Sequence, residues 1–166
     1  LPLWVAIGGT ASPGLRAANM GLPLTIAIIG GTPEQFVPHT KYYRDEFIKA
    51  GHDISTLQLC INSHAYIAND SQQAADEFFP VYAAVMSRIG AELGLPPPTR
   101  PPFDFMRSPA GSLLVGSPLL LISTIFSAHP LFVNTHFLFH FLLRTFHPNQ
   151  ILHHLHLFGN AFCPPV

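Results

Sequence analysis

Apolar residues open the chain in two short runs, 3–7 and 24–29, that show no regular alternation with polar residues. A run of this length and composition is typical of a strand buried on both faces, as in a parallel sheet. Each run leads into the same tripeptide, Gly8-Gly9-Thr10 in the first case and Gly30-Gly31-Thr32 in the second. The repeated order predicts two consecutive units in which a strand, a glycine turn and a helix follow one another.

Both tripeptides are followed by residues that favour the start of a helix. After the first, Ser12-Pro13 offers a capping hydroxyl and then a proline, which fits the first turn of a helix. After the second, Thr32–Gln35 has the sequence of a capping box. The helix that it opens carries an apolar stripe and is expected to end at Gly51.

The rest of the chain continues the alternation of strands and helices. Strands are predicted at 57–67, at the short run 113–115 and at 137–143, and helices at 71–93, from 117 onward and at 148–158. Pro80 should kink or divide the helix over 71–93, and the proline-rich segment 95–110 is predicted to be a loop. We expect one α/β domain over residues 1–166 with a parallel sheet and right-handed crossovers.

Composition narrows the classes of function. Eight basic residues face nine acidic ones, and without basic runs the chain has no electrostatic footprint for nucleic acid. The two cysteines are far apart and show no metal or disulfide spacing, which favours a cytoplasmic protein. The uncharged stretch Leu113–Val133 is long enough to cross a membrane. Because Ser117-Pro118 and His129-Pro130 interrupt it, a membrane span is only the third hypothesis.

Histidines are the residues that most invite a metal hypothesis, since the chain has ten of them. His153 and His156 could share one face of the last helix, and His136 and His140 could share one side of the preceding strand. No Asp, Glu or Cys accompanies them in a ligand pattern. We therefore predict no metal site, and we interpret His64, in the middle of a strand, as a core histidine.

Several segments together resemble the second half of the luciferase-like flavin-dependent monooxygenases, the superfamily of bacterial luciferase and alkanal monooxygenase. They occur in the family's order at Trp4–Thr10, Arg16–Pro23, Ala27–Gly31, Tyr43-Arg44, Ala50–Asp53, Ala68–Ala75, Leu114–Pro118, Gln150–Leu152 and Leu157–Gly159. The resemblance implies a partial (β/α)8 TIM barrel, made of about the last four strand–helix units. It also implies an FMN-dependent monooxygenase or oxidoreductase, of which this chain would supply part of the flavin-binding half.

The resemblance places FMN at the carboxyl ends of the strands. Glycines after a strand let the backbone approach a phosphate, and the next helix offers unpaired N–H groups. Gly8, Gly9, Thr10 and Ser12 are the candidates for the phosphate, and Ile29 and Gly30 for the ring system. The partners it implies are O2, a small organic substrate and a separate reductase that supplies reduced FMN, with the deazaflavin F420 as the alternative cofactor. Since the catalytic residues of the family lie largely on its first half, no catalytic residue is assigned.

The sequence departs from the family pattern in ways that support a second hypothesis. Ser12-Pro13 stands where the family usually has Glu-Ser, so a phosphate-binding hydroxyl could be displaced. Positions that usually carry charge are here Leu119, Leu120, Thr124, His153, His154 and His156. An apolar outer face and two open sheet edges suit association. The alternative is therefore a non-catalytic half-barrel that forms a homo-oligomer or pairs with the missing N-terminal half.

Overall fold

The computed structural model of the protein describes residues 2–141 and 148–162. Within these residues, five strands form one parallel sheet. The strands are β1 (Val5–Ile7), β2 (Leu24–Ala27), β3 (Leu59–Ile67), β4 (Leu114–Gly116) and β5 (His136–His140). The predicted parallel α/β sheet is confirmed.

The strands β1, β2, β3 and β5 follow one another across the sheet in chain order. β3 is long enough to pair with two strands at different points along its length. β5 pairs with its residues Cys60–His64, and β4 pairs with the next residues, Ala65–Ile67. β4 is thus a short addition at the carboxyl end of β3. Four principal strands remain, which agrees with the four strand–helix units that the family resemblance implies.

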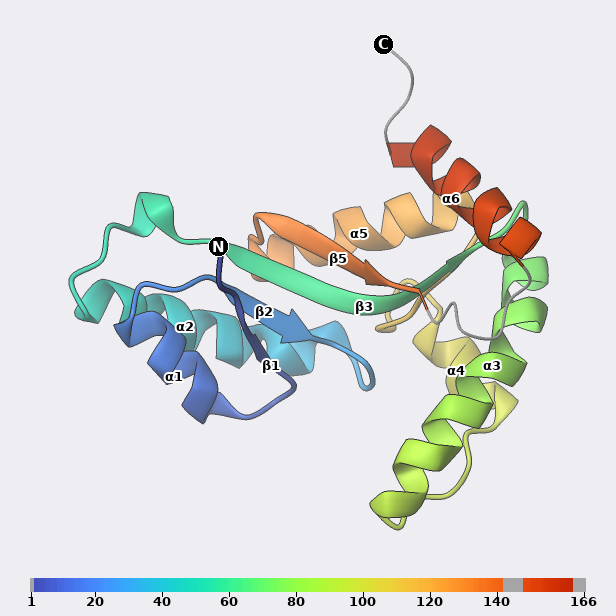
Figure 1. Ribbon diagram of the computed structural model, residues 1–166, viewed down its shortest axis with the longest axis horizontal. Coiled ribbons are helices and arrows are strands. Elements are labelled where there is room, and N and C mark those ends of the chain that lie inside the picture. The colour runs from blue at the N-terminus through green and yellow to red at the C-terminus, as the bar shows by residue number, and fades with distance from the viewer. Residues whose placement is uncertain (1, 142–147, 163–166) are drawn as a thin grey trace.

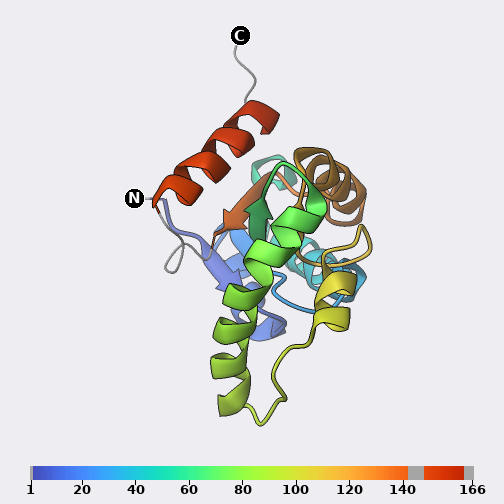
Figure 2. The same cartoon turned by 90° about the vertical axis from the view of Figure 1, so that its right-hand side faces the viewer.

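Helices connect every pair of consecutive strands, and one more helix follows the last strand. They are α1 (Ala11–Asn19), the 3-10 helix η1 (Pro33–Phe36), α2 (Val37–Lys49), the 3-10 helix η2 (Ile54–Thr56), α3 (Ser71–Glu92), α4 (Arg100–Met106), α5 (Pro118–Phe132) and α6 (Pro148–Phe162). α1 and α2 contact each other beside β1 and β2, whereas α3 and α4 lie at the other end of the sheet (Figure 1). α6 contacts α5, and its C-terminal end extends above the other helices in both views (Figures 1 and 2).

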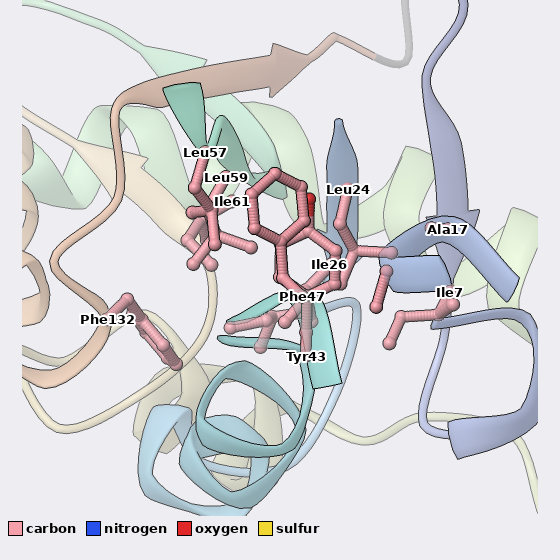
Figure 3. Packing of buried hydrophobic residues seen from close by; sticks show 12 residues of the cluster. Ile7, Ala17, Leu24, Ile26, Tyr43, Phe47, Leu57, Leu59, Ile61 and Phe132 are labelled. Carbon is pink, nitrogen blue, oxygen red and sulfur yellow. The ribbon is translucent and has the colours of Figure 1, made fainter. Parts of the chain in front are cut away.

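The main core lies between the sheet and the helices α1 and α2. Tyr43 and Phe47 of α2 pack towards Leu24 and Ile26 of β2, as Figure 3 shows, and all four side chains are buried. The Tyr43 hydroxyl donates a hydrogen bond of 2.8 Å to the carbonyl of Leu22. Burial raises the pKa of Tyr43 to about 12, so that this hydroxyl keeps its proton.

A second core is aromatic and joins α3 and α4 to the end of β3. Phe78 and Tyr82 of α3 lie with ring centroids 6.4 and 5.3 Å from that of Phe103 in α4. Tyr66 of β3 adds a fourth ring, 5.3 Å from Phe78. Its hydroxyl donates a hydrogen bond of 2.7 Å to Glu77. These contacts attach the long helix to the sheet.

The structure confirms the helix predicted over 71–93 and corrects two details that concern proline. At Pro80, of the predicted kink or division, the division does not occur, because α3 continues through this residue as one helix. Pro80 is on the exposed side, where water can satisfy the carbonyl that a proline leaves free, while Phe78 and Tyr82 anchor the helix on both sides. The segment 95–110 contains α4 and is not wholly a loop, because Pro101 and Pro102 occupy its first turn, where no helical N–H is needed.

Ion pairs further explain why α4 forms. Arg100 contacts Asp104, one turn later, at 3.0 Å and Asp76 of α3 at 2.8 Å. Arg107 contacts Asp104 at 2.7 Å and donates a hydrogen bond to the carbonyl of Ser71. These spacings of three and four residues were present in the sequence.

Element ends also differ from the predictions. α1 begins at Ala11 with Thr10 as its N-cap, so Ser12 lies in the first turn and is not the cap. α6 extends to Phe162, beyond the predicted end at 158. The predicted strand 137–143 runs from His136 to His140, and its residues 142 and 143 lie outside the described residues.

The uncharged stretch Leu113–Val133 folds as two elements, β4 and the 15-residue helix α5. Ser117 separates them and caps α5 by accepting a hydrogen bond from the backbone N–H of Leu120. In the described part of the chain, no helix has the length and apolar character needed to cross a membrane.

Arg44 joins α2 to the end of α5, and its loss is expected to destabilise the fold. Its guanidinium donates hydrogen bonds to the carbonyls of Phe132 and Val133, the latter at 2.9 Å. Val133 has a φ of 47°, so the arginine holds a strained helix end. We expect Arg44→Met to lower the free energy of unfolding, measured with urea, by about 2 kcal/mol.

Lys41→Met in the same helix is the matched control for Arg44→Met. Among the described residues, Lys41 pairs with Asp45 alone, at 2.6 Å, and both side chains are more than half exposed. Such a pair contributes at most about 0.5 kcal/mol. If the two variants lose the same free energy of unfolding, Arg44 stabilises the fold only through its positive charge and not through its hydrogen bonds to the end of α5.

Candidate functional site

Both glycine tripeptides lie at the same rim of the sheet. β1 and β2 are parallel, with Val5 opposite Leu24 and Ile7 opposite Ile26. Gly8-Gly9-Thr10 follows the end of β1, and Gly30-Gly31-Thr32 follows β2 after two further residues. The carboxyl ends of parallel strands meet at one edge, and this is where α/β folds bind their ligands.

The first loop leaves space and N–H groups where a phosphate could bind. Gly8 and Gly9 are exposed, and a Cβ added at either would meet nothing within 4 Å. Gly9 has a φ of 113°, which only glycine adopts without strain. Thr10 makes no side-chain capping bond, and the first turn of α1 holds no acidic residue. The helix N-terminus therefore keeps its positive potential.

The second loop is partly occupied by the chain itself. The predicted capping box of Thr32 and Gln35 is present, and in it the Gln35 side chain accepts a hydrogen bond of 3.4 Å from the backbone N–H of Thr32. The Gln35 side chain would also lie 2.2 Å from a Cβ on Gly31. Gly30 has open space instead, and Ile29 is 40% exposed beside it. The second loop is thus less suited to bind an anion than the first. It presents an apolar side chain and an open glycine to a ligand instead.

Ser12 is an exposed residue of the first turn of α1. Pro13, which follows it, has no N–H, so this turn offers fewer backbone donors than a turn without proline. Gly8, Gly9, Thr10 and Ser12 are thus placed consecutively at one end of α1. Ile29 and Gly30 follow the neighbouring strand.

The sheet curves around a pocket on the face away from α1 and α2. Trp4 precedes β1 and His136 begins β5, yet their ring centroids are only 5.2 Å apart, edge to face. The first and fourth strands of a flat sheet would be roughly 14 Å apart. Both side chains therefore point inward from a curved sheet. They line a pocket with a volume of about 320 Å³, together with Thr25, Cys60, Phe137 and Leu138.

This pocket lies towards the amino-terminal ends of the strands, since Trp4 and His136 stand at strand starts. The glycine loops lie at the opposite rim. Burial raises the pKa of the Cys60 thiol in the pocket, which makes it a poor nucleophile at neutral pH. The pocket therefore has the character of a barrel interior.

A histidine pair lies further along the same two strands. His64 of β3 is opposite His140 of β5, and their ring centroids are 5.0 Å apart. Burial is the main cause that lowers the pKa of His64 to about 4, and the charge of His140 lowers it further. A hydrogen bond to the backbone of His140 raises the pKa and offsets part of this shift. His64 is 6% exposed, as predicted for a core histidine, and is neutral at pH 7.

Sequence reasoning did not find the residues of the curved inner face. A signal was available in β3, where Cys60, Asn62 and His64 alternate with Leu59, Ile61 and Ser63. The alternation shows that two sets of side chains point to opposite faces. It does not show which distant residues, such as Trp4, would lie against them.

The predicted apolar outer face forms only in part. Leu119 is 77% exposed, and His153 and His156 are exposed on α6. Thr124 and His154 are buried instead, at 5% and 3% exposure. His154 can be buried because its Nδ1 makes a close polar contact with the carbonyl of Ile67. Among the residues that the structure describes, no three His, Cys, Asp or Glu side chains form a group that could hold a metal ion.

Comparison with known proteins gives matches in structure and none in sequence. No family model matches the chain, and no curated protein matches it. Monooxygenase RslO1 from Streptomyces bottropensis superposes on 97% of this chain with a TM-score of 0.72 and 19% identity. The oxygenating constituent of 3,6-diketocamphane monooxygenase from Pseudomonas putida, in complex with FMN, superposes on 97% with a TM-score of 0.66 and 15% identity.

An F420-dependent secondary alcohol dehydrogenase superposes on 85% of the chain, with a TM-score of 0.61 and 13% identity. At these identities the likeness concerns the fold. The chain spans about half the length of these proteins, 47% of the two monooxygenases and 43% of the dehydrogenase. Its parallel sheet, its helices and its inward curvature agree with such a match. The chain therefore has the fold of about half of a luciferase-like barrel.

Proposed function

We propose that this chain supplies part of the flavin-binding half of an FMN-dependent monooxygenase or oxidoreductase of the luciferase-like family. The observation that carries the proposal is the open loop Gly8-Gly9-Thr10 at the N-terminus of α1, on the ligand-binding rim of the sheet. That the chain corresponds to the C-terminal half of such a barrel is part of the proposal. A location in the cytoplasm is part of it too. So are the partners, which are O2, a small organic substrate and a separate reductase.

The residues present fit a phosphate better than a neutral ligand. A phosphate binds where backbone N–H groups converge without a competing carboxylate, and the first turn of α1 meets both conditions. In this proposal, Gly8 and Gly9 give the phosphate close access to the backbone, and Thr10 and Ser12 supply hydroxyls. Ile29 and Gly30 contact the ring system from the neighbouring strand.

The chain's role is to hold and orient the cofactor and to keep water from it. Reduced flavin would supply two electrons, so that one oxygen atom of O2 enters the substrate and the other leaves as water. The deazaflavin F420 is the alternative cofactor, since one of the structural neighbours is F420-dependent. None of the described side chains is assigned a catalytic role.

Titration with FMN and riboflavin, followed by quenching of flavin fluorescence, tests the proposal. FMN should bind saturably and roughly tenfold more tightly than riboflavin, because charge-assisted bonds to the phosphate contribute about 1.4 kcal/mol or more. Equal affinities would contradict the phosphate role of the glycine loop. Absence of saturable binding for FMN, riboflavin and F420 would leave a non-catalytic half-barrel as the function.

A non-catalytic half-barrel is the second candidate, and a specific observation favours it. In the described residues, β1 pairs only with β2, and β5 only with β3, so both edges of the principal sheet are open. Open edges pair readily with other strands. Assembly of such a chain would be its function.

A further inference from the structure

We infer that a second copy of this chain covers the curved inner face, and that the two copies together close a barrel of eight parallel strands. In this dimer, β5 (His136–His140) of each copy pairs with β1 (Val5–Ile7) of the other. The pocket lined by Trp4, Cys60 and Leu138 becomes the interior of the barrel. In this dimer the second copy takes the place of an N-terminal half at the inner face. Flavin binding at the Gly8 loop and dimer formation are measured separately, and either can fail without the other.

The strands themselves limit what can close the sheet. The four principal strands are parallel and stand in chain order, with β1 and β5 at the two edges. The edge-to-face contact of Trp4 with His136 shows that the sheet already curves, so that its edges turn towards the same side. A parallel barrel of this type closes at eight strands. Four further parallel strands with the same curvature would therefore close it.

A second copy supplies four such strands through a twofold axis parallel to the barrel axis. Such an axis keeps all strands parallel and brings β5 of one copy beside β1 of the other. The two matched monooxygenases support a partner of this size, because this chain covers 47% of the length of each. The partner must thus be about as large as this chain.

Side chains of the inner face have the character of a contact surface. Leu138 is 51% exposed in the middle of β5, and His136 and His140 are exposed on either side of it. In a closed barrel, such inward side chains fill the interior with those of the opposite strands. The pocket of about 320 Å³ is the part of that interior that one copy leaves open.

Mass measured by light scattering over a range of concentrations tests the inference, together with the emission of Trp4. Trp4 is the single tryptophan of the chain and lines the pocket. We expect twice the mass of one chain, and a shift of Trp4 emission to shorter wavelength over the same concentration range. A monomer at all concentrations would overturn the inference. It would also be overturned if the chain stays monomeric by itself but binds a separately supplied first half of a luciferase-like barrel.

Leu138→Lys and Leu119→Lys form a matched pair of variants. Both leucines are at least half exposed, at 51% and 77%, so neither change should disturb folding. Leu138→Lys places a charge in the inner face and should weaken the dimer at least roughly tenfold. Leu119→Lys lies on α5, outside this face, and should leave the dimer intact. A dimer that survives Leu138→Lys, or that only Leu119→Lys disrupts, would show another contact surface and refute the inference.

Discussion

Gly8→Asp is expected to weaken FMN binding by about 100-fold while the protein stays folded. In the proposed site, the phosphate of FMN lies against the N-terminus of α1, directly beyond Gly8. An aspartate there would compete for the same N–H groups, and it would repel the phosphate. A Cβ at Gly8 meets nothing within 4 Å, and its φ is not in the left-handed region. A carboxylate near a helix N-terminus is itself mildly stabilising.

Gly8→Asn provides the control for charge, since asparagine has nearly the same size and shape as aspartate. FMN titration of both variants, with the thermal unfolding midpoint of each, separates electrostatic from steric effects. We expect Gly8→Asn to lose less than roughly tenfold in affinity, about 1.4 kcal/mol. If both variants lose affinity for FMN equally, the size of the new side chain and not its charge weakens binding. If neither does, the phosphate binds elsewhere.

Stability is expected to fall on acidification from pH 6.5 towards 4, in large part because of His64. An unfolded histidine takes up a proton near pH 6.5, whereas burial holds the pKa of folded His64 at about 4. Between these values the unfolded chain binds more protons than the folded one. The stabilisation is therefore complete above pH 6.5 and lost as the pH falls through 4, with a loss of about 2.5 kcal/mol by pH 4.5.

His64→Gln removes this titration and keeps a polar side chain beside His140 and Tyr82. Urea unfolding of both proteins at several pH values should show a stability difference that shrinks by about 2.5 kcal/mol between pH 7 and 4.5. Burial also lowers the pKa of His154, so the variant should keep part of the acid sensitivity. Parallel pH curves for the two proteins would mean that water reaches the His64 ring in solution.

The candidate flavin rim could be predicted from the sequence because its parts are local. Two apolar runs, each followed by Gly-Gly-Thr and a helix, specify adjacent strand–helix units. Parallel pairing of such units then leaves both loops at the same rim, as found for Gly8 and Gly30. The position of Ser12 could not be predicted as well, because Thr10 and Ser12 can each begin a helix. Only the backbone geometry at Thr10 shows which one is the cap.

Errors in the prediction arose where distant residues outweigh local preferences. Proline lowers the propensity for helix over 95–110, yet α4 forms there, and α3 continues undivided through Pro80. Phe78, Tyr82 and Phe103 bury their rings together, and this packing compensates for the lost hydrogen bond. Likewise, Thr124 and His154 looked like surface positions, but neighbouring elements cover them.

The sequence by itself determined the parallel α/β class, the succession of strands and helices, and the loops that follow the first two strands. These depend on hydrophobic period, glycine and capping residues, which act over a few positions along the chain. The tertiary structure alone decided the curvature of the sheet, the pocket between Trp4 and His136, and the neutral state of His64. Each of these depends on burial and on contacts between residues far apart in sequence, which no local pattern specifies.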